Sequence, residues 1–331
     1  MQKILTIVIP SYNTENYIDE CLPTFLSNEI LNKIEILIVN DGSKDNTLKI
    51  AKKYEATYPN TIKVIDKENG GHGSTINYGI KYASGRYFKV IDGDDWVDSD
   101  QLCLFVDYIS KLNDIDLILN PFTIINEKTK DTTKFEYSDL QYNEIYDADF
   151  IYSLSKNIQM HSITYRTDIL KDNEIKLDEK MFYVDQEYNL FPIPFIKSVI
   201  YLPYNVYQYR TFSQNQSMNF NNLQKNRNMH KNVLLNLNLY YTKNKDSISD
   251  AKREYFKRCI SDMAFLQILI YLSIKYNKTV KLEFYNFLKE IEEIELSWNR
   301  ASYIIKQFKK FNFKFYRLFN LYIRLRMKKY L

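Results

Sequence analysis

The sequence predicts an α/β fold for its first two thirds, followed by a region made of helices. Short apolar runs alternate with stretches of helical periodicity, which is the pattern of a doubly wound parallel sheet with helices on both faces. Polar clusters directly follow several of these runs, and ligands in such sheets bind at the carboxyl ends of the strands. From about Asn221 the periodicity is helical almost without interruption to Leu331. We therefore expect an α/β domain over residues 1–217 and a helical domain over 218–331.

Composition narrows the class of protein. The chain has 331 residues, 45% hydrophobic and 26% charged, so it can bury a large core and remain soluble. No apolar run reaches the roughly 18 residues that a membrane-spanning helix requires. The apolar N-terminus lacks a small-residue cleavage site, so we expect a first strand there and not a signal peptide. Cys21, Cys103 and Cys259 lie far apart and form no CxxC pair, which favours a reducing compartment.

Four apolar runs in the first part of the chain predict buried strands, and polar residues follow them. Pro10 ends the first run, Asn40-Asp41-Gly42-Ser43 follows the second, and Asn69-Gly70-Gly71-His72-Gly73 follows the third. Ser43 or Asp45 can cap the helix after the second run. We expect strands at 4–9, 34–39, 62–65 and 86–91. Helices are expected at 15–26, from the cap at residue 43 or 45 to residue 54, and at 74–83.

Beyond residue 97 the alternation is less regular. A helix is expected to begin at Asp185 and to be broken by Pro192 and Pro194. The polar run from Asn215 to Asn222 is typical of a linker, so the boundary between the two domains is placed there. The remaining expected elements are helices at 102–112 and 147–155, strands at 117–125 and 199–209, and a polar hairpin at 128–137.

A cluster of acids follows the fourth apolar run. Asp92, Asp94 and Asp95 lie within four residues, around Gly93. Like charges this close together destabilise the fold unless a cation neutralises them. Carboxylate oxygens are the ligands that Mg²⁺ and Mn²⁺ prefer. The alternative is an ordinary Asp-Gly turn that caps the next helix, and the cluster by itself leaves both interpretations open.

Five motifs, in order along the chain, resemble those of the family 2 glycosyltransferases, inverting enzymes with the GT-A fold. Each motif alone is a weak signal, but five at this spacing are specific, and the resemblance covers roughly residues 3 to 210. The chain is most similar to Gram-positive bacterial enzymes that build surface polysaccharides or glycoproteins. The motifs are Val8–Asn13, Val39–Thr47, Asn69–Gly79, Ser84–Tyr87 and Asp92–Asp95.

The resemblance implies a UDP-sugar donor, a glycan or glycoprotein acceptor, and a Mn²⁺ or Mg²⁺ ion held by Asp92 and Asp94. Tyr12 would stack on the nucleotide base and Asp41 would accept its N–H. The alternatives are that Tyr12 covers the core and that Gly73 is an ordinary turn glycine. The residues implied in donor binding are Pro10, Tyr12, Asp41, Asn69, Gly71, Gly73, Asn77, Asp92, Gly93 and Asp94, with Asn77 expected to hold the glycine-rich loop.

The resemblance also implies a catalytic base. Inversion by direct displacement requires one group that deprotonates the acceptor hydroxyl. The segment Tyr183–Tyr188 resembles the base segment of the family and places Asp185 at the base position. The acid that usually precedes the base is Val184 here, so Glu187 stays open as a rival. Both acids also suit the first turn of a helix, where they interact favourably with the helix dipole.

Two more residues and the C-terminal tail leave alternatives open. His161 and Arg210 are candidates for contacts with the acceptor or the diphosphate, and His161 is equally a candidate for a structural hydrogen bond. Residues 306–331 contain nine Lys or Arg and no acid, although the net charge of the whole chain is only +4. This aromatic, basic tail either lies on an anionic membrane surface or packs on the helical domain with its charges in water. We favour packing.

The resemblance implies a metal-dependent transferase of a single hexose, with galactose or glucose expected because they are the commonest donors of the family, and no binding of nucleic acid is expected. The QxxRW motif and the transmembrane helices of processive synthases are absent from the sequence. The alternative function is a non-catalytic sugar-nucleotide-binding or scaffold partner of another transferase. The expected location is cytoplasmic, with peripheral contact at the inner face of the plasma membrane as a secondary expectation.

Overall fold

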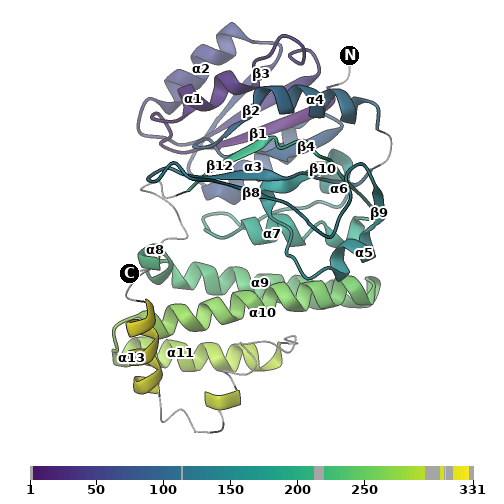
Figure 1. Cartoon of the computed structure of the whole chain (residues 1–331). Coiled ribbons are helices and arrows are strands. Elements are labelled where there is room, and N and C mark those ends of the chain that lie inside the picture. Colours follow the sequence, from purple (N-terminus) through teal and green to yellow (C-terminus); the bar gives the residue numbers. More distant parts are fainter. Residues whose placement is uncertain are drawn as a thin grey trace. The chain divides into compact units, whose positions relative to one another are not determined.

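The chain forms two compact units, Met1–Gln214 and Asn215–Leu331. Each unit buries its own set of apolar side chains. Among the described residues, no helix is both long enough and apolar enough to cross a bilayer. The structure, a computed structural model, describes residues 3–112, 115–211, 220–294, 306–308, 310 and 316–327 (Figure 1).

An eight-stranded sheet forms the centre of the first unit, in the order β3-β2-β1-β4-β10-β6-β11-β9 (Figure 1). β1 pairs in parallel with β2 and β4, and β2 pairs in parallel with β3. β10 is antiparallel to β4 and β6, and β9 is antiparallel to β11. The strands are β1 Leu5–Ser11, β2 Ile34–Asp41, β3 Ile62–Lys67, β4 Tyr87–Val90, β6 Leu117–Leu119, β9 Ile145–Asp147, β10 Ile163–Arg166 and β11 Ser198–Tyr201.

The sheet is therefore mixed. The parallel arrangement predicted for the first four strands is confirmed for β1 to β4, and antiparallel pairs follow beyond β4. Parallel pairing requires a crossover between successive strands. That strand–helix–strand repeat stops after β4, where the chain continues into a second sheet. The α/β class itself is confirmed, because β1 is buried along its whole length, as a strand covered on both faces must be.

The helices of the first unit begin and end close to the expected positions, with two differences. The helix expected at 15–26 is shorter, because Pro23 begins a 3₁₀ turn after α1. α3 begins at Gly71, so the glycine-rich loop forms its first turn. The helices are α1 Ile18–Cys21, α2 Thr47–Thr57, α3 Gly71–Tyr82, α4 Ser99–Ser110, α5 Ala148–Ser153, α6 Thr167–Asp172 and α7 Asp185–Leu190, with 3₁₀ turns at Leu22–Phe25, Met160–Ser162 and Ile193–Phe195.

A second sheet of four strands carries residues of the site. Its order is β5-β12-β7-β8, with β5 Trp96–Val97, β7 Phe122–Asn126, β8 Thr132–Phe135 and β12 Tyr207–Thr211. The strands expected at 117–125 and 199–209 are each divided in two, with one half in each sheet. Pro121 and Pro203 lie at the divisions, where a residue without an N–H cannot continue the ladder.

The second unit is helical in the part of it that the structure describes. His230 of α9 is buried with its Nδ1 2.6 Å from Oε1 of Gln267 in α10. Arg227 of α9 forms an ion pair with Glu283 of α11 at 2.8 Å. Most of the predicted linker from Asn215 to Asn222 lies outside the described residues. The helices are α8 Phe220–Lys225, α9 Arg227–Asn244, α10 Asp250–Ser273, α11 Lys278–Glu290 and α13 Tyr316–Met327, with 3₁₀ turns at Lys245–Ser247 and Ile291–Glu293.

Candidate active site

The acidic turn lies between β4 and β5, against the end of β1. Gly93 donates its N–H to the Pro10 carbonyl at 3.1 Å. A Cβ at Gly93 would lie 2.8 Å from that carbonyl oxygen and 2.9 Å from Oγ of Ser11, so only glycine allows this approach. The N-cap of α4 is Asp98, which accepts from the Gln101 N–H. The acids of the turn are therefore not needed to cap the next helix.

Strand β12 holds the third acid of the turn. The carboxylate of Asp95 accepts from the Tyr207 hydroxyl at 2.7 Å and from the Arg210 N–H at 2.7 Å. The Tyr207 hydroxyl in turn accepts from the Asp92 N–H at 3.1 Å. One tyrosine therefore fixes both ends of the acidic turn. The sequence assigned no role to Tyr207, because nothing in its own segment indicates this pairing.

The Arg210 side chain contacts the backbone of the same acidic turn. Its Nε donates to the Asp94 carbonyl at 2.8 Å, and its two Nη atoms pair with Glu20 at 2.9 Å and Glu127 at 3.2 Å. The guanidinium lies 4.6 Å from the centre of the Trp96 ring. These contacts make Arg210 a residue that positions the backbone of Asp94.

The acids of the turn differ in their pKa values. Burial, and next the charge of Asp92, raises the pKa of Asp94 to about 6. Burial also raises the pKa of Asp95 well above its usual value. The pKa of Asp92 is lowered, because His72, with Nε2 2.9 Å from Oδ1 of Asp92, outweighs the effect of burial. The charge of Asp92 raises the pKa of His72 despite burial, so the two side chains favour an ion pair.

Three side chains can offer ligand atoms to a metal ion. Asp92, Asp95 and His161 each place one such atom within 4.8 Å of the other two. The Nδ1 of His161 is buried and has no hydrogen-bond partner among the residues described, and burial lowers the pKa of this ring to about 4. A neutral imidazole with a free nitrogen suits a divalent cation. Lys89 donates to the His161 carbonyl at 3.1 Å. Asp94, a predicted ligand, is not in this group.

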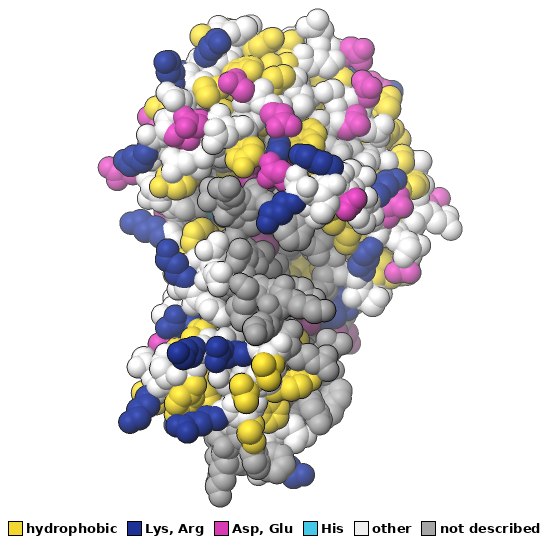
Figure 2. Space-filling view, turned by 60° about the vertical axis from the view of Figure 1, so that its left-hand side comes forward, with side chains coloured by type: hydrophobic (Ala, Val, Ile, Leu, Met, Phe, Trp, Pro, Cys, Tyr) yellow, Lys and Arg dark blue, Asp and Glu magenta, His cyan; other side chains and the backbone are white. Residues whose placement is uncertain are grey.

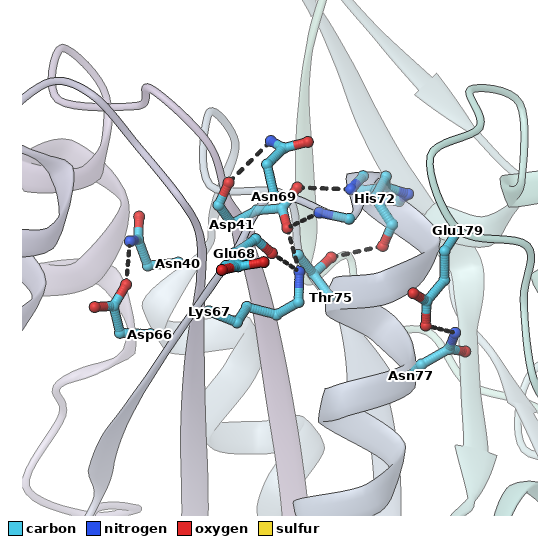
Figure 3. A network of polar contacts seen from close by, with 12 residues as sticks. Asn40, Asp41, Asp66, Lys67, Glu68, Asn69, His72, Thr75, Asn77 and Glu179 are labelled. Carbon is cyan, nitrogen blue, oxygen red and sulfur yellow. Dashed lines mark hydrogen bonds and ion pairs between the residues drawn. The ribbon is translucent and has the colours of Figure 1, made fainter.

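The glycine-rich loop is tied to the end of β2 by Asp41 (Figure 3). The carboxylate of Asp41 accepts from the N–H groups of Gly70 and Gly71, both at 2.8 Å, and forms an ion pair with Lys67. Asn69 donates from Nδ2 to the Asp41 carbonyl at 2.9 Å. Asp41 and Asn69, both predicted donor-binding residues, thus meet at one point. Contact of Asp41 with a nucleotide base stays a prediction.

The glycines of this loop allow another segment, residues 177–181, to approach. A Cβ at Gly73 would overlap the Asp178 carbonyl oxygen, and one at Gly71 would lie 3.2 Å from the Lys180 nitrogen. Asn77 exchanges two hydrogen bonds of 2.9 Å with the backbone of Leu177. Asn77 therefore holds this second segment, whereas the sequence predicted that it holds the glycine-rich loop itself.

The two candidate bases at the start of α7 lie in different surroundings. Glu187 is completely buried, and its Oε2 accepts from the Asp178 N–H at 2.7 Å. Asp185 is only half-buried, and burial raises its pKa, with smaller effects from His72 and Asp92. The two acids thus differ in burial and in partners: Glu187 is enclosed and hydrogen-bonded, whereas part of Asp185 is accessible.

The first motif presents Tyr12 to solvent. Pro10 is buried in β1, while Tyr12, just beyond the end of that strand, is 50% exposed. Half of the Tyr12 side chain is thus open to solvent, and its stacking on a nucleotide base stays a prediction. An exposed ring at the carboxyl end of a central strand is free to stack on a planar ligand.

A family model agrees with this arrangement of strands and motifs. The model described as "Glycosyl transferase family 2" matches residues 6–173. The chain belongs to this family.

Curated relatives of this family member are bacterial. The minor teichoic acid biosynthesis protein GgaB of Bacillus subtilis is 34% identical over 126 residues, which is 38% of this chain and 14% of GgaB. The uncharacterized glycosyltransferase EpsJ of the same species is 30% identical over 221 residues, 63% of this chain and 62% of EpsJ. The matches thus span less than two thirds of the length of either relative.

Solved structures show that this chain has the GT-A fold. The Staphylococcus aureus TarS fragment 1-349 in complex with UDP-GlcNAc is 18% identical, with a TM-score of 0.62 over 97% of this chain and 89% of that one. The mannosyltransferase PcManGT of Pyrobaculum calidifontis, in complex with GDP-Man and Mn²⁺, is 12% identical with a TM-score of 0.53 over 98% of this chain and 85% of that one. At these identities the likeness concerns the fold.

Proposed function

We propose that this transferase is metal-dependent and inverting, and that it moves one hexose from a UDP-sugar to a glycan or glycoprotein acceptor. The observation that carries the proposal is the group of ligand atoms that Asp92, Asp95 and His161 bring within 4.8 Å of one another. The half-buried Asp185, at the start of α7, is the carboxylate that we propose acts beside this group. One accessible carboxylate beside a cluster of ligand atoms is what an inverting displacement requires.

The donor would bind across the ends of β1, β2 and β4. Tyr12 would stack on the uracil, and the loop held by Asp41 and Asn69 would lie along the nucleotide. The UDP and UDP-GlcNAc in the TarS complexes support a uridine diphosphate donor. Galactose and glucose are the sugars we propose first, and N-acetylglucosamine joins the set to be tested because of TarS.

A divalent cation, Mn²⁺ or Mg²⁺, fits the acidic turn. Asp92 and His161 would hold it together with Asp94 or Asp95, and the unpartnered Nδ1 of His161 supports this donor set. When bound, such an ion supplies positive charge at the leaving diphosphate. Arg210 keeps the turn in position, because its Nε–H holds the Asp94 carbonyl.

Asp185 would act as the general base. It takes the proton of the acceptor hydroxyl while the new bond to the anomeric carbon forms and the bond to the diphosphate breaks. Its raised pKa strengthens it as a base, since a carboxylate in a partly buried site holds a proton more firmly than one in water. Glu187 is not suited to this step, because it is buried and already accepts from the Asp178 N–H.

UDP release from purified protein tests the proposal. UDP-galactose, UDP-glucose and UDP-N-acetylglucosamine are each supplied with Mn²⁺ and with EDTA. We expect release from one donor, lost in EDTA. Binding of UDP without release from any donor, even with a mixture of bacterial glycans as acceptor, would favour the non-catalytic sugar-nucleotide-binding partner. Equal rates with and without EDTA would refute the metal.

A further inference from the structure

Helix α13 is attached to the second unit by one of its faces. Tyr316 and Asn320 are almost completely buried, at 1% and 3% exposure. Asn320 donates from Nδ2 to the carbonyls of Leu272 at 2.7 Å and Ile274 at 2.8 Å, at the end of α10. These carbonyls have no partner within their own helix, so the bonds fix α13 firmly. The ring of Tyr316 also packs on that of Phe284 at 5.3 Å.

The opposite face of α13 is apolar as well, and it is exposed. Its members are spaced i, i+3, i+4 and i+7, which places them in one stripe, turned about half a circle from the buried pair. Contiguous exposed apolar residues on a surface are typical of an interaction site. The outward stripe consists of Leu318 at 62%, Leu321 at 54%, Tyr322 at 54% and Leu325 at 63% exposure.

Within the described part of α13, the charged residues beside the outward stripe are positive. Arg317 and Arg324 lie along one side of it by helical spacing. In the sequence, residues 306–331 hold nine Lys or Arg and no Asp or Glu. Hydrophobic and basic side chains lie side by side in the lower part of Figure 2. The occupant of the stripe must therefore be both apolar and negatively charged at its edge.

We propose that the outward stripe of α13 docks on an anionic lipid bilayer. The leucines would enter the boundary between headgroups and acyl chains, and the arginines would lie at the lipid phosphates. A second copy of this chain fits less well, because two such stripes would bring like charges together. The proposal uses no residue of the candidate active site, so it does not depend on the proposed function.

Co-sedimentation with vesicles tests the docking. The full chain is mixed with vesicles of equal parts phosphatidylglycerol and phosphatidylcholine, or of phosphatidylcholine alone. We expect binding to the first and little to the second, weakened by salt. The double variant Leu321→Ser, Leu325→Ser should bind roughly tenfold more weakly, because two apolar side chains no longer enter the bilayer.

A matched control separates the stripe from exposed leucines in general. Leu104 and Leu239 are 54% and 51% exposed and lie on α4 and α9. Leu104→Ser with Leu239→Ser should bind vesicles like the wild type. The variant Arg317→Gln, Arg324→Gln should lose the preference for phosphatidylglycerol. The leucine variants should keep the unfolding midpoint, whereas the arginine variant also loses the contact of Arg317 with the Tyr276 ring, 4.4 Å to its centre. All variants should keep the rate of UDP release from soluble donors, which keeps this test apart from that of the proposed function.

Three results would overturn the docking. The first is a wild-type chain that does not sediment with the anionic vesicles. The second is binding that the Leu321→Ser, Leu325→Ser variant leaves undiminished. The third is a wild-type dimer in sedimentation equilibrium that this variant converts to a monomer, which would assign the stripe to a second copy of the chain.

Discussion

Replacing the two acids of α7 one at a time separates the base from its neighbour. Asp185→Asn keeps the size of the side chain and removes the proton acceptor. Loss of general-base catalysis lowers turnover by about 10² to 10⁴-fold, equal to about 3 to 5 kcal/mol in the activation barrier. UDP affinity should stay unchanged, because in the proposed mechanism Asp185 acts on the acceptor and not on UDP.

The structure predicts the opposite pattern for Glu187→Gln. Glu187 is fully buried and accepts from the Asp178 N–H at 2.7 Å. An amide oxygen keeps this hydrogen bond but loses the contribution of the charge, so we expect a loss of about 1–2 kcal/mol in the free energy of unfolding. Asp185→Asn should leave stability equal or slightly higher, because burial raises the pKa of Asp185 and so disfavours its charged form.

Three measurements on each variant decide the matter: the initial rate of UDP release with saturating donor and acceptor, UDP affinity by calorimetry, and urea unfolding followed by circular dichroism. The reasoning is refuted if Glu187→Gln loses turnover at unchanged stability while Asp185→Asn stays active. The base would then be the residue that the structure shows as buried.

Three further changes test the acidic turn and the helical unit. Asp94→Ala should reduce Mn²⁺-dependent UDP release by about 10³-fold or more. The free energy of unfolding should not fall, because a like charge beside Asp92 is removed. Full activity would exclude Asp94 as a metal ligand. Arg210→Lys loses the Nε–H that holds the Asp94 carbonyl and should weaken Mn²⁺ affinity by about 10-fold to 100-fold. Unchanged affinity in calorimetry would restrict Arg210 to a structural role. Burial lowers the pKa of His230 to about 4, below its unfolded value of about 6.5. The contribution of neutral His230 to the free energy of unfolding is thus complete above a pH of about 6.5. It falls by up to about 3 kcal/mol toward pH 4, because in this range only the unfolded chain takes up the proton. His230→Gln should remove this part of the slope in urea unfolding, and an identical slope would contradict it.

The sequence by itself predicted the features that depend on short segments. Apolar runs predicted β1 to β4. The signal is strongest for β1 and β2, which are buried along almost their whole length, because a strand buried on both faces needs apolar residues throughout. Their polar ends predicted that Asp41, Asn69 and Asp92 lie along one edge of the sheet. The motifs identified the family, because each occupies only a few consecutive residues. The family model and the relatives confirm that identification.

Only the tertiary structure decided which distant side chains meet. Tyr207 and Arg210 hold Asp95 because β12 pairs with β5 in a second sheet, a pairing that no local pattern specifies. Asp185 and Glu187 are two residues apart and chemically alike. Their difference arises because residues two apart lie on different sides of a helix, so Glu187 is buried in the core while Asp185 is only half-buried. The fold of the chain follows from local periodicity, whereas the chemistry of its site follows from contacts between segments that the periodicity does not describe.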